Sequence, residues 1–283
     1  MAGGGQVVPL AEAEGLVWGD PADPVALERA LDEAPHLRWI QLPFAGVERF
    51  IDLIDDDRIW TCGKGVYADP VAELALTLGL AGLRGLGTYA RADSWGGQLG
   101  TNLLDGRVTI VGGGGITESL LRLLAPFRAH ITVVRNRPEP MDGADDVLGS
   151  DHLDRALPGA DLVVLALALT PDTRGLMGAD QFGLMESHAW LVNVARGQHV
   201  VTDELVDALR NEEIGGAALD VTDPEPLPAG HPLWSLPNCI ITPHVGNTQE
   251  MARPLLSARI SENVRRWTED EPLIGRVRPE LGY

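Results

Sequence analysis

The stretch Val108-Thr-Ile-Val-Gly-Gly-Gly-Gly-Ile-Thr117 decides the fold of this chain. A short β-branched run leads into four glycines, and the segment Ile116–Leu124 that follows has the apolar pattern of a helix. Glycines at such a turn let the backbone approach a pyrophosphate at the positive end of the helix. In this strand-to-helix context the turn predicts a dinucleotide-binding site, whereas a glycine run alone would indicate only a flexible turn.

Beyond this turn, short apolar runs alternate with helical segments from Arg107 onward. The runs are continuous rather than alternating in polarity, which is typical of strands covered on both faces. The expected strands are Val108–Val111, Ile131–Val134, Asp161–Leu167, Trp190–Val194, Ala217–Val221 and Cys239–Thr242, and the helices between them are Ile116–Leu124, Asp151–Leu157 and Asp203–Arg210. Repeated strand–helix units predict an α/β fold with a doubly wound parallel sheet.

The two ends of the chain are less regular. The expected elements there are a helix at Pro24–Leu31, a strand at Leu37–Leu42, a long buried helix at Asp69–Leu86 and a helix at Ala252–Trp267. Because the last helix follows the last strand, we expect it to pack on the N-terminal part. The prediction is a discontinuous smaller domain, residues 1–88 and 250–283, around a continuous dinucleotide-binding domain, residues 89–249.

Composition excludes several classes of function. Lys and Arg number 22 against 41 Asp and Glu, a net charge of −19 that disfavours nucleic acid and anionic membrane surfaces as partners. Cys62 and Cys239 form neither a disulfide framework nor a metal-ligand pattern, so no metal site is expected. The start, Met1–Leu10, lacks a signal-peptide pattern, and Val71–Leu83 is too short to cross a bilayer. The expected location is cytoplasmic.

The second expected strand ends in Val134-Arg135-Asn136-Arg137. An NAD site normally has Asp or Glu here to bind the ribose 2′-hydroxyl, whereas guanidinium groups bind a 2′-phosphate through charge-assisted hydrogen bonds. These residues therefore favour NADP over NAD, with NAD as a possible cofactor. The alternative is a pair of solvated arginines at a strand end.

Three later strand ends carry ionisable residues, namely Arg196, Glu225 and His244. Ligands bind at the carboxyl ends of strands in open α/β sheets. An Arg can bind the carboxylate of a 2-oxo acid and polarise its carbonyl, a His can deliver a proton, and a carboxylate can keep that His charged. The set predicts reduction of a 2-oxo acid; singly, each residue could be a salt-bridging Arg, a loop acid or an ordinary His.

With these motifs, V-N-x-A-R-G at 192–197, D-V-x-x-x-E-P-L at 220–227 and P-H-x-G at 243–246, the sequence resembles the D-isomer-specific 2-hydroxyacid dehydrogenase family. The resemblance runs from about Pro43 to Arg265. It implies a Rossmann domain, a smaller flavodoxin-like substrate domain, and Arg196, Glu225 and His244 as catalytic residues. It also implies a small acid of the glyoxylate or hydroxypyruvate type, and a homodimer with Val71–Leu86 and Ser94–Leu104 as its candidate surface.

The resemblance and the glycine fingerprint also imply contacts with ligands. The cofactor contacts would come from Gly112, Gly114, Gly115, Ile116, Leu167, Leu169, Thr173, Val194, Ala195, Asp220 and Gly246, in addition to Arg135, Asn136 and Arg137. Asp220 would lie near the nicotinamide carboxamide. The backbone N–H groups of Ala45 and Gly46, in the loop Leu42–Glu48, would hold the substrate carboxylate beside Arg196.

The sequence departs from the family pattern at Thr117, which replaces the third fingerprint glycine, and at Arg135, which replaces the usual Asp. The remaining histidines have no motif context and are interpreted as structural or surface residues: His36, His130, His152, His188, His199 and His231. One rival hypothesis is an NAD(P)H-sensing binding protein or corepressor on the same scaffold. Another keeps the enzyme but gives it a phosphorylated or bulky acid, although Leu42–Glu48 carries no additional basic residue for a phosphate.

Overall fold

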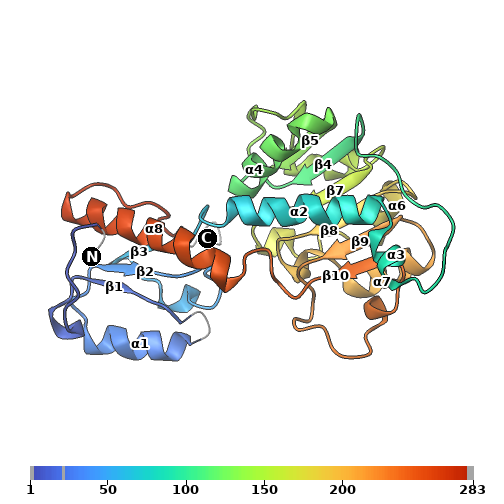
Figure 1. The fold of residues 1–283 in the computed structure, drawn as a ribbon. Helices are drawn as coiled ribbons and strands as arrows, with labels where there is room; N and C mark the ends of the chain where they lie inside the picture. Colours follow the sequence, from blue (N-terminus) through green and yellow to red (C-terminus); the bar gives the residue numbers. More distant parts are fainter. Residues whose placement is uncertain (1–2, 21–22, 279–283) are drawn as a thin grey trace. The chain divides into compact units, whose positions relative to one another are not determined.

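The computed structural model describes residues 3–20 and 23–278, and this part of the chain forms two compact units (Figure 1). Unit 1 is Met1–Tyr67 with Thr248–Tyr283, and unit 2 is the continuous segment Ala68–Asn247. Unit 1 therefore joins segments from both ends of the sequence.

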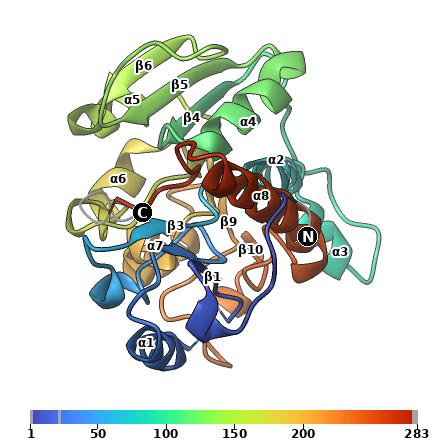
Figure 2. The same ribbon diagram turned by 90° about the vertical axis from the view of Figure 1, so that its left-hand side faces the viewer.

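Within residues 68–247, all of which the structure describes, seven parallel strands form one sheet in the order β10-β9-β8-β7-β4-β5-β6. Figure 2 shows β4, β5 and β6 side by side. The strands are β4 (Arg107–Val111), β5 (His130–Arg135), β6 (Asp146–Gly149), β7 (Leu162–Leu165), β8 (Trp190–Asn193), β9 (Gly216–Leu219) and β10 (Cys239–Ile241). The predicted α/β fold with a parallel sheet is confirmed. Its strand order reverses between β4 and β7, where open α/β sheets bind ligands.

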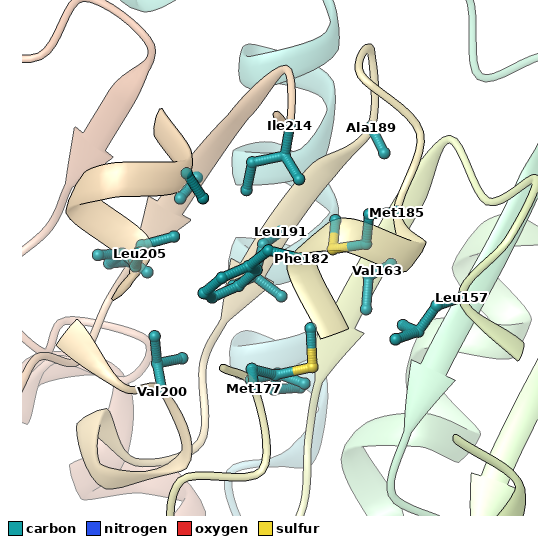
Figure 3. Close-up of a cluster of buried hydrophobic side chains, with 14 of the residues drawn as sticks. Leu157, Val163, Met177, Phe182, Met185, Ala189, Leu191, Val200, Leu205 and Ile214 are labelled. Carbon is teal, nitrogen blue, oxygen red and sulfur yellow. The ribbon is translucent and has the colours of Figure 1, made fainter. Parts of the chain in front are cut away.

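Helices cover both faces of this sheet. They are α2 (Ala68–Leu83), α3 (Leu86–Arg91), α4 (Gly115–Leu124), α5 (Leu153–Ala156), α6 (Ala179–Leu184) and α7 (Thr202–Arg210), with short 3-10 turns at Ala125–Phe127, Ser150–His152, Pro171–Thr173, Gly197–His199 and Pro232–Trp234. Alternate residues of each strand pack on opposite faces: Val163 joins the cluster of α5, α6 and α7 (Figure 3), and Leu162 joins that of α2 and α4. This two-sided burial explains the continuous apolar runs.

The long helix expected at Asp69–Leu86 ends earlier, at Leu83. Gly85 has a left-handed backbone (φ +63°), and the chain restarts as α3. Because α2 packs against α4 and β8, it groups with unit 2, whereas the sequence placed residues 68–88 in the smaller domain. The short β6 and α6 were not anticipated.

Unit 1 contains a three-stranded parallel sheet, counted over its described residues, in the order β1 (Gly15–Val17), β2 (Trp39–Gln41) and β3 (Ile59–Thr61). Helices α1 (Pro24–Glu33) and α8 (Gln249–Thr268) lie on opposite faces of it (Figure 1), and 3-10 turns occur at Leu10–Glu12 and Ile51–Leu53. The buried Asn263 of α8 donates to Gln41 of β2 (2.9 Å), which anchors the C-terminal helix on a sheet formed 222 residues earlier.

Across the described ranges, no helix is both long enough and apolar enough to cross a membrane.

Candidate active site

The glycine turn follows β4, next to the point where the strand order reverses. Gly112 has φ +122°, and a Cβ there would collide with the carbonyl oxygen of Ala166 after β7. Gly114 is the N-cap of α4, and a Cβ there would meet nothing within 4 Å. The turn thus needs glycine at its tight point and leaves open space at the helix N-terminus, the geometry that a pyrophosphate requires.

Thr117, in the first turn of α4, is completely buried. Its hydroxyl donates a hydrogen bond of 2.9 Å to the carbonyl oxygen of Gly112. The residue that replaces the third fingerprint glycine therefore ties the helix to the glycine turn. Thr117 is recognisable in the sequence as a departure from the fingerprint, but its bond to Gly112 is visible only in the structure.

Arg135 lies at the end of β5, and its side chain lies against the glycine turn. A Cβ on Gly113 would come within 2.6 Å of Arg135 Nε and 2.7 Å of its Cδ, so these two residues are packed together. Asn136 and Arg137 follow and are exposed. The structure thus brings the Arg135 guanidinium beside the turn, and a second arginine, two residues later in the chain, is exposed to solvent.

The segment Leu167–Thr173 follows β7, the strand beside β4. The Thr173 hydroxyl donates to the Ala168 carbonyl (2.9 Å) and accepts from the Thr170 N–H (2.8 Å), which closes the segment into a compact turn. Leu167 and Leu169 are half-buried within it. The turn borders the glycine turn, because Gly112 contacts the strand end at Ala166.

Arg196 stands in the turn after β8, and Asn193 at the end of that strand shapes the turn. The buried Asn193 side chain accepts from the Ala195 N–H (3.0 Å) and donates to the Arg196 carbonyl (2.9 Å). Arg196 is half-buried, and its Nη1 donates to the Ala195 carbonyl (2.8 Å). Val194 and Ala195 are buried. Sequence reasoning missed Asn193, whose signal was a polar residue at the end of an apolar run.

Two of the predicted catalytic residues, His244 and Glu225, are in direct side-chain contact. The His244 Nδ1 lies 2.7 Å from Glu225 Oε1, and about half of each side chain is exposed. His244 has φ +53°, a left-handed conformation that is uncommon for a residue with a side chain. Such a conformation persists where the surroundings hold it.

Asp220, at the end of β9, holds the loop that carries His244. Asp220 is 3% exposed, and its carboxylate accepts from the Thr242 hydroxyl (2.5 Å), the Val245 N–H (2.9 Å) and the Gly246 N–H (2.9 Å). Its backbone carbonyl accepts from the His244 N–H (2.8 Å). The cofactor contact expected for Asp220 stays a prediction; these bonds show that Asp220 organises the His244 loop, in which the part of Thr242 was not predicted.

The predicted residues of unit 2 lie at one edge of the sheet, because its strands are parallel and each residue follows a strand end. This edge presents a glycine turn with a cation beside it, a half-buried Arg and a His–carboxylate pair, a set suited to holding an anionic ligand and moving a proton. Ala45 and Gly46 belong to unit 1, in the loop after β2 that Tyr67 holds through the Pro43 carbonyl (2.6 Å).

Comparison with known proteins gives a consistent result. Residues 74–246 match the family described as "D-isomer specific 2-hydroxyacid dehydrogenase, NAD binding domain". A protein of Corynebacterium melassecola, named an uncharacterized protein in the proB 3′ region, is 38% identical over 89% of this chain and 86% of its own length. The mouse glyoxylate reductase/hydroxypyruvate reductase is 35% identical over 71% of this chain and 64% of its own length.

Among solved structures, a D-isomer specific 2-hydroxyacid dehydrogenase of Xanthobacter autotrophicus Py2, in complex with NADPH and MES, superposes with a TM-score of 0.83. It shares 30% of its sequence with this chain, and the match covers 98% of this chain and 87% of the other.

Proposed function

This chain belongs to the D-isomer-specific 2-hydroxyacid dehydrogenase family, a family of NAD(P)-dependent oxidoreductases, and from that premise we propose that it reduces small 2-oxo acids of the glyoxylate or hydroxypyruvate type with NADPH. The observation that carries the proposal is the His244–Glu225 pair at the same sheet edge as Arg196. The reverse reaction would oxidise a D-2-hydroxy acid. A purely NAD(P)H-sensing protein would not need this complete set.

Each residue of the set has a distinct task in this proposal. The Arg196 guanidinium binds the substrate carboxylate and polarises the adjacent carbonyl group. The Glu225 carboxylate accepts a hydrogen bond from the Nδ1–H of His244, which leaves the Nε2–H to be donated as a proton to the carbonyl oxygen. When bound, the reduced nicotinamide supplies the hydride that the keto carbon accepts. The oxo acid, one hydride and one proton together give the hydroxy acid.

The preference for NADP rests on Arg135. Its guanidinium lies against Gly113, at the strand end where a carboxylate would repel a 2′-phosphate, and the exposed Arg137 follows two residues later in the chain. The related Xanthobacter structure contains NADPH. We retain NAD as a second cofactor. Initial rates with NADPH and NADH, for the native protein and for Arg135→Asp, test this choice; a native protein that prefers NADH by a large factor contradicts it.

The choice of a small acid rests on the glyoxylate/hydroxypyruvate reductases among the relatives. It also rests on the loop Leu42–Glu48 after β2, which carries no additional basic residue for a phosphate. The prediction that the Ala45 and Gly46 backbone binds the substrate carboxylate stays part of the proposal. A bulky or phosphorylated acid is the rival substrate. A panel of glyoxylate, hydroxypyruvate and larger or phosphorylated 2-oxo acids, compared by kcat/KM, separates the two.

The experiment that tests the mechanism replaces His244 with Asn. The variant should bind NADPH with unchanged affinity and lose turnover of glyoxylate by at least about a hundredfold, because general acid catalysis contributes factors of that size. His188→Asn is the matched control, since His188 pairs with Asp161 on an exposed part of the same unit. Unchanged turnover in His244→Asn would refute the assigned role.

We also propose a cytoplasmic homodimer. Much of the apolar part of Val71–Leu83, expected from the sequence to belong to the dimer surface, is buried within unit 2, so the proposed surface is α3 and the loop after it. Exposed apolar side chains gather there, at Leu86, Tyr89, Trp95, Leu99 and Leu104. A large contiguous apolar patch on a protein surface usually marks an interaction site, and the proposal is that these side chains form one. Sedimentation equilibrium of the native protein and of a variant with Trp95→Ser and Leu99→Ser tests it: the native protein should be a dimer and the variant a monomer.

A further inference from the structure

His199 lies in the 3-10 turn that begins directly after Arg196, and its imidazole is completely buried. Nδ1 lies 2.9 Å from the carbonyl oxygen of Thr173, and Nε2 lies 3.3 Å from that of Leu167. These two carbonyls are the first and last of the turn 167–173. The ring therefore crosses the base of the turn that was predicted to contact the cofactor.

The backbone continues this connection. The Gly175 N–H donates to the Gln198 carbonyl (2.8 Å), and the Met177 N–H donates to the His199 carbonyl (2.9 Å). On the other side, the His199 N–H donates to the Arg196 carbonyl (3.2 Å). His199 thus stands between the turn after β7 and the residue assigned to the substrate carboxylate, with bonds to both.

We propose that His199 is a positioning residue that holds the turn 167–173 in its cofactor-binding shape and fixes that turn to the Arg196 segment. The proposal rests on the proposed function, which assigns the cofactor and the acid to these segments. His199 touches neither reacting atom, so its loss should weaken binding of NADPH and of the acid while the proton transfer by His244 continues.

The hydrogen-bond chemistry of the site makes the role testable. Both partners of the ring are carbonyl oxygens, which only accept, and a neutral imidazole has a single N–H. We assign that proton to Nδ1, which donates to the Thr173 carbonyl, because this contact is the shorter of the two. An Asn side chain places its NH₂ near the position of Nδ1, a Gln side chain places it near that of Nε2, and Phe keeps the ring without any donor.

The experiment compares the full-length native protein with His199→Asn, His199→Gln and His199→Phe. Calorimetric titration with NADPH in the absence of substrate gives the Kd, and glyoxylate kinetics give KM and kcat. We expect His199→Asn to stay within about twofold of the native Kd. His199→Gln and His199→Phe should raise the Kd by about tenfold, equivalent to about 1.4 kcal/mol, raise the KM for glyoxylate, and leave kcat at saturation within about threefold.

Controls separate this role from a merely structural one. His188→Asn should leave the Kd, KM and kcat unchanged, and thermal unfolding without cofactor reports the stability of each variant. The inference is overturned if the Kd stays at the native value in all three variants, or if His199→Asn binds as poorly as His199→Phe. A native protein that binds neither NADPH nor NADH would instead refute the proposed function, and this inference with it.

Discussion

The Glu225 carboxylate lies 2.7 Å from His244 Nδ1, although the two residues are 19 positions apart in the chain. Both side chains are about half exposed, so water screens their attraction and the pair adds little to the free energy of unfolding. Its effect falls on the imidazole itself. The contact orients the ring and leaves Nε2 as the nitrogen that can give up a proton to a ligand.

Replacing Glu225 with Gln tests the charge of this pair separately from its geometry. The amide oxygen can still accept from Nδ1, but it no longer balances an imidazolium, so we expect kcat for glyoxylate to fall by about tenfold to a hundredfold. The melting temperature should stay within about 2 °C of the native value. Glu213→Gln, at an exposed site after α7, serves as the control. Native turnover in Glu225→Gln would show that the charge is dispensable.

A second prediction concerns Asp220, whose carboxylate holds the loop that carries His244. In Asp220→Asn one of the two N–H groups, of Val245 or Gly246, faces an NH₂ group and loses its acceptor, which costs about 1–3 kcal/mol. We expect a lower melting temperature together with a fall in kcat. Thr242→Val removes only the hydroxyl bond and should give a smaller effect on both. If kcat falls while the melting temperature is unchanged, Asp220 acts on the ligand rather than on the loop.

Variants of Thr117 test whether its hydroxyl holds the glycine turn in place. Thr117→Val keeps the volume but deletes the bond to the Gly112 carbonyl, so we expect a loss of about 1–2 kcal/mol in the free energy of unfolding and weaker NADPH binding. Thr117→Ser keeps the hydroxyl and should bind NADPH more tightly than the Val variant. Urea unfolding and calorimetric titration measure both effects. Equal NADPH affinity in the Val and Ser variants would show that the hydroxyl does not hold the turn.

His199 predicts a dependence of stability on pH. The pKa of His199 is lowered mainly by burial of its imidazole. The positive charges of Arg196 and Arg174 lower this pKa further, whereas the hydrogen bonds to the carbonyls of Thr173 and Leu167 raise it. The unfolded chain, with a histidine pKa of about 6.5, therefore binds the proton first as the pH falls. The contribution of neutral His199 to stability is complete above that pH and is lost as the pH falls toward the lower folded pKa.

Urea unfolding of the native protein and of His199→Asn at several pH values between about 5 and 7.5 measures this contribution. We expect the native protein to lose stability relative to the variant as the pH falls. An increase in the relative stability of the native protein toward acid pH would mean that buried His199 gains its proton readily and donates to both carbonyls.

Much of unit 2 could be predicted because its strands are buried on both faces. Each strand therefore appears in the sequence as a continuous run of apolar residues. Each predicted strand ends close to the end of the observed strand. The residues that follow these ends, Arg196 and His244 among them, could therefore be placed at one edge of the sheet. The short strand β6 was not predicted because Asp146–Gly149 begins with an exposed acidic residue and its other residues are only half-buried. The end of α2 was missed because the break depends on the backbone of Gly85.

The sequence by itself determined the α/β class, the glycine turn after β4 and the residue types at each strand end, since these follow from local patterns of burial and turn formation. Only the tertiary structure decided which groups meet: Asp220 with the backbone of Val245 and Gly246, His199 with the turn 167–173, and Asn263 with Gln41. These partners are up to 222 residues apart, and a buried polar group finds its partner through the packing of whole elements, which no local pattern records.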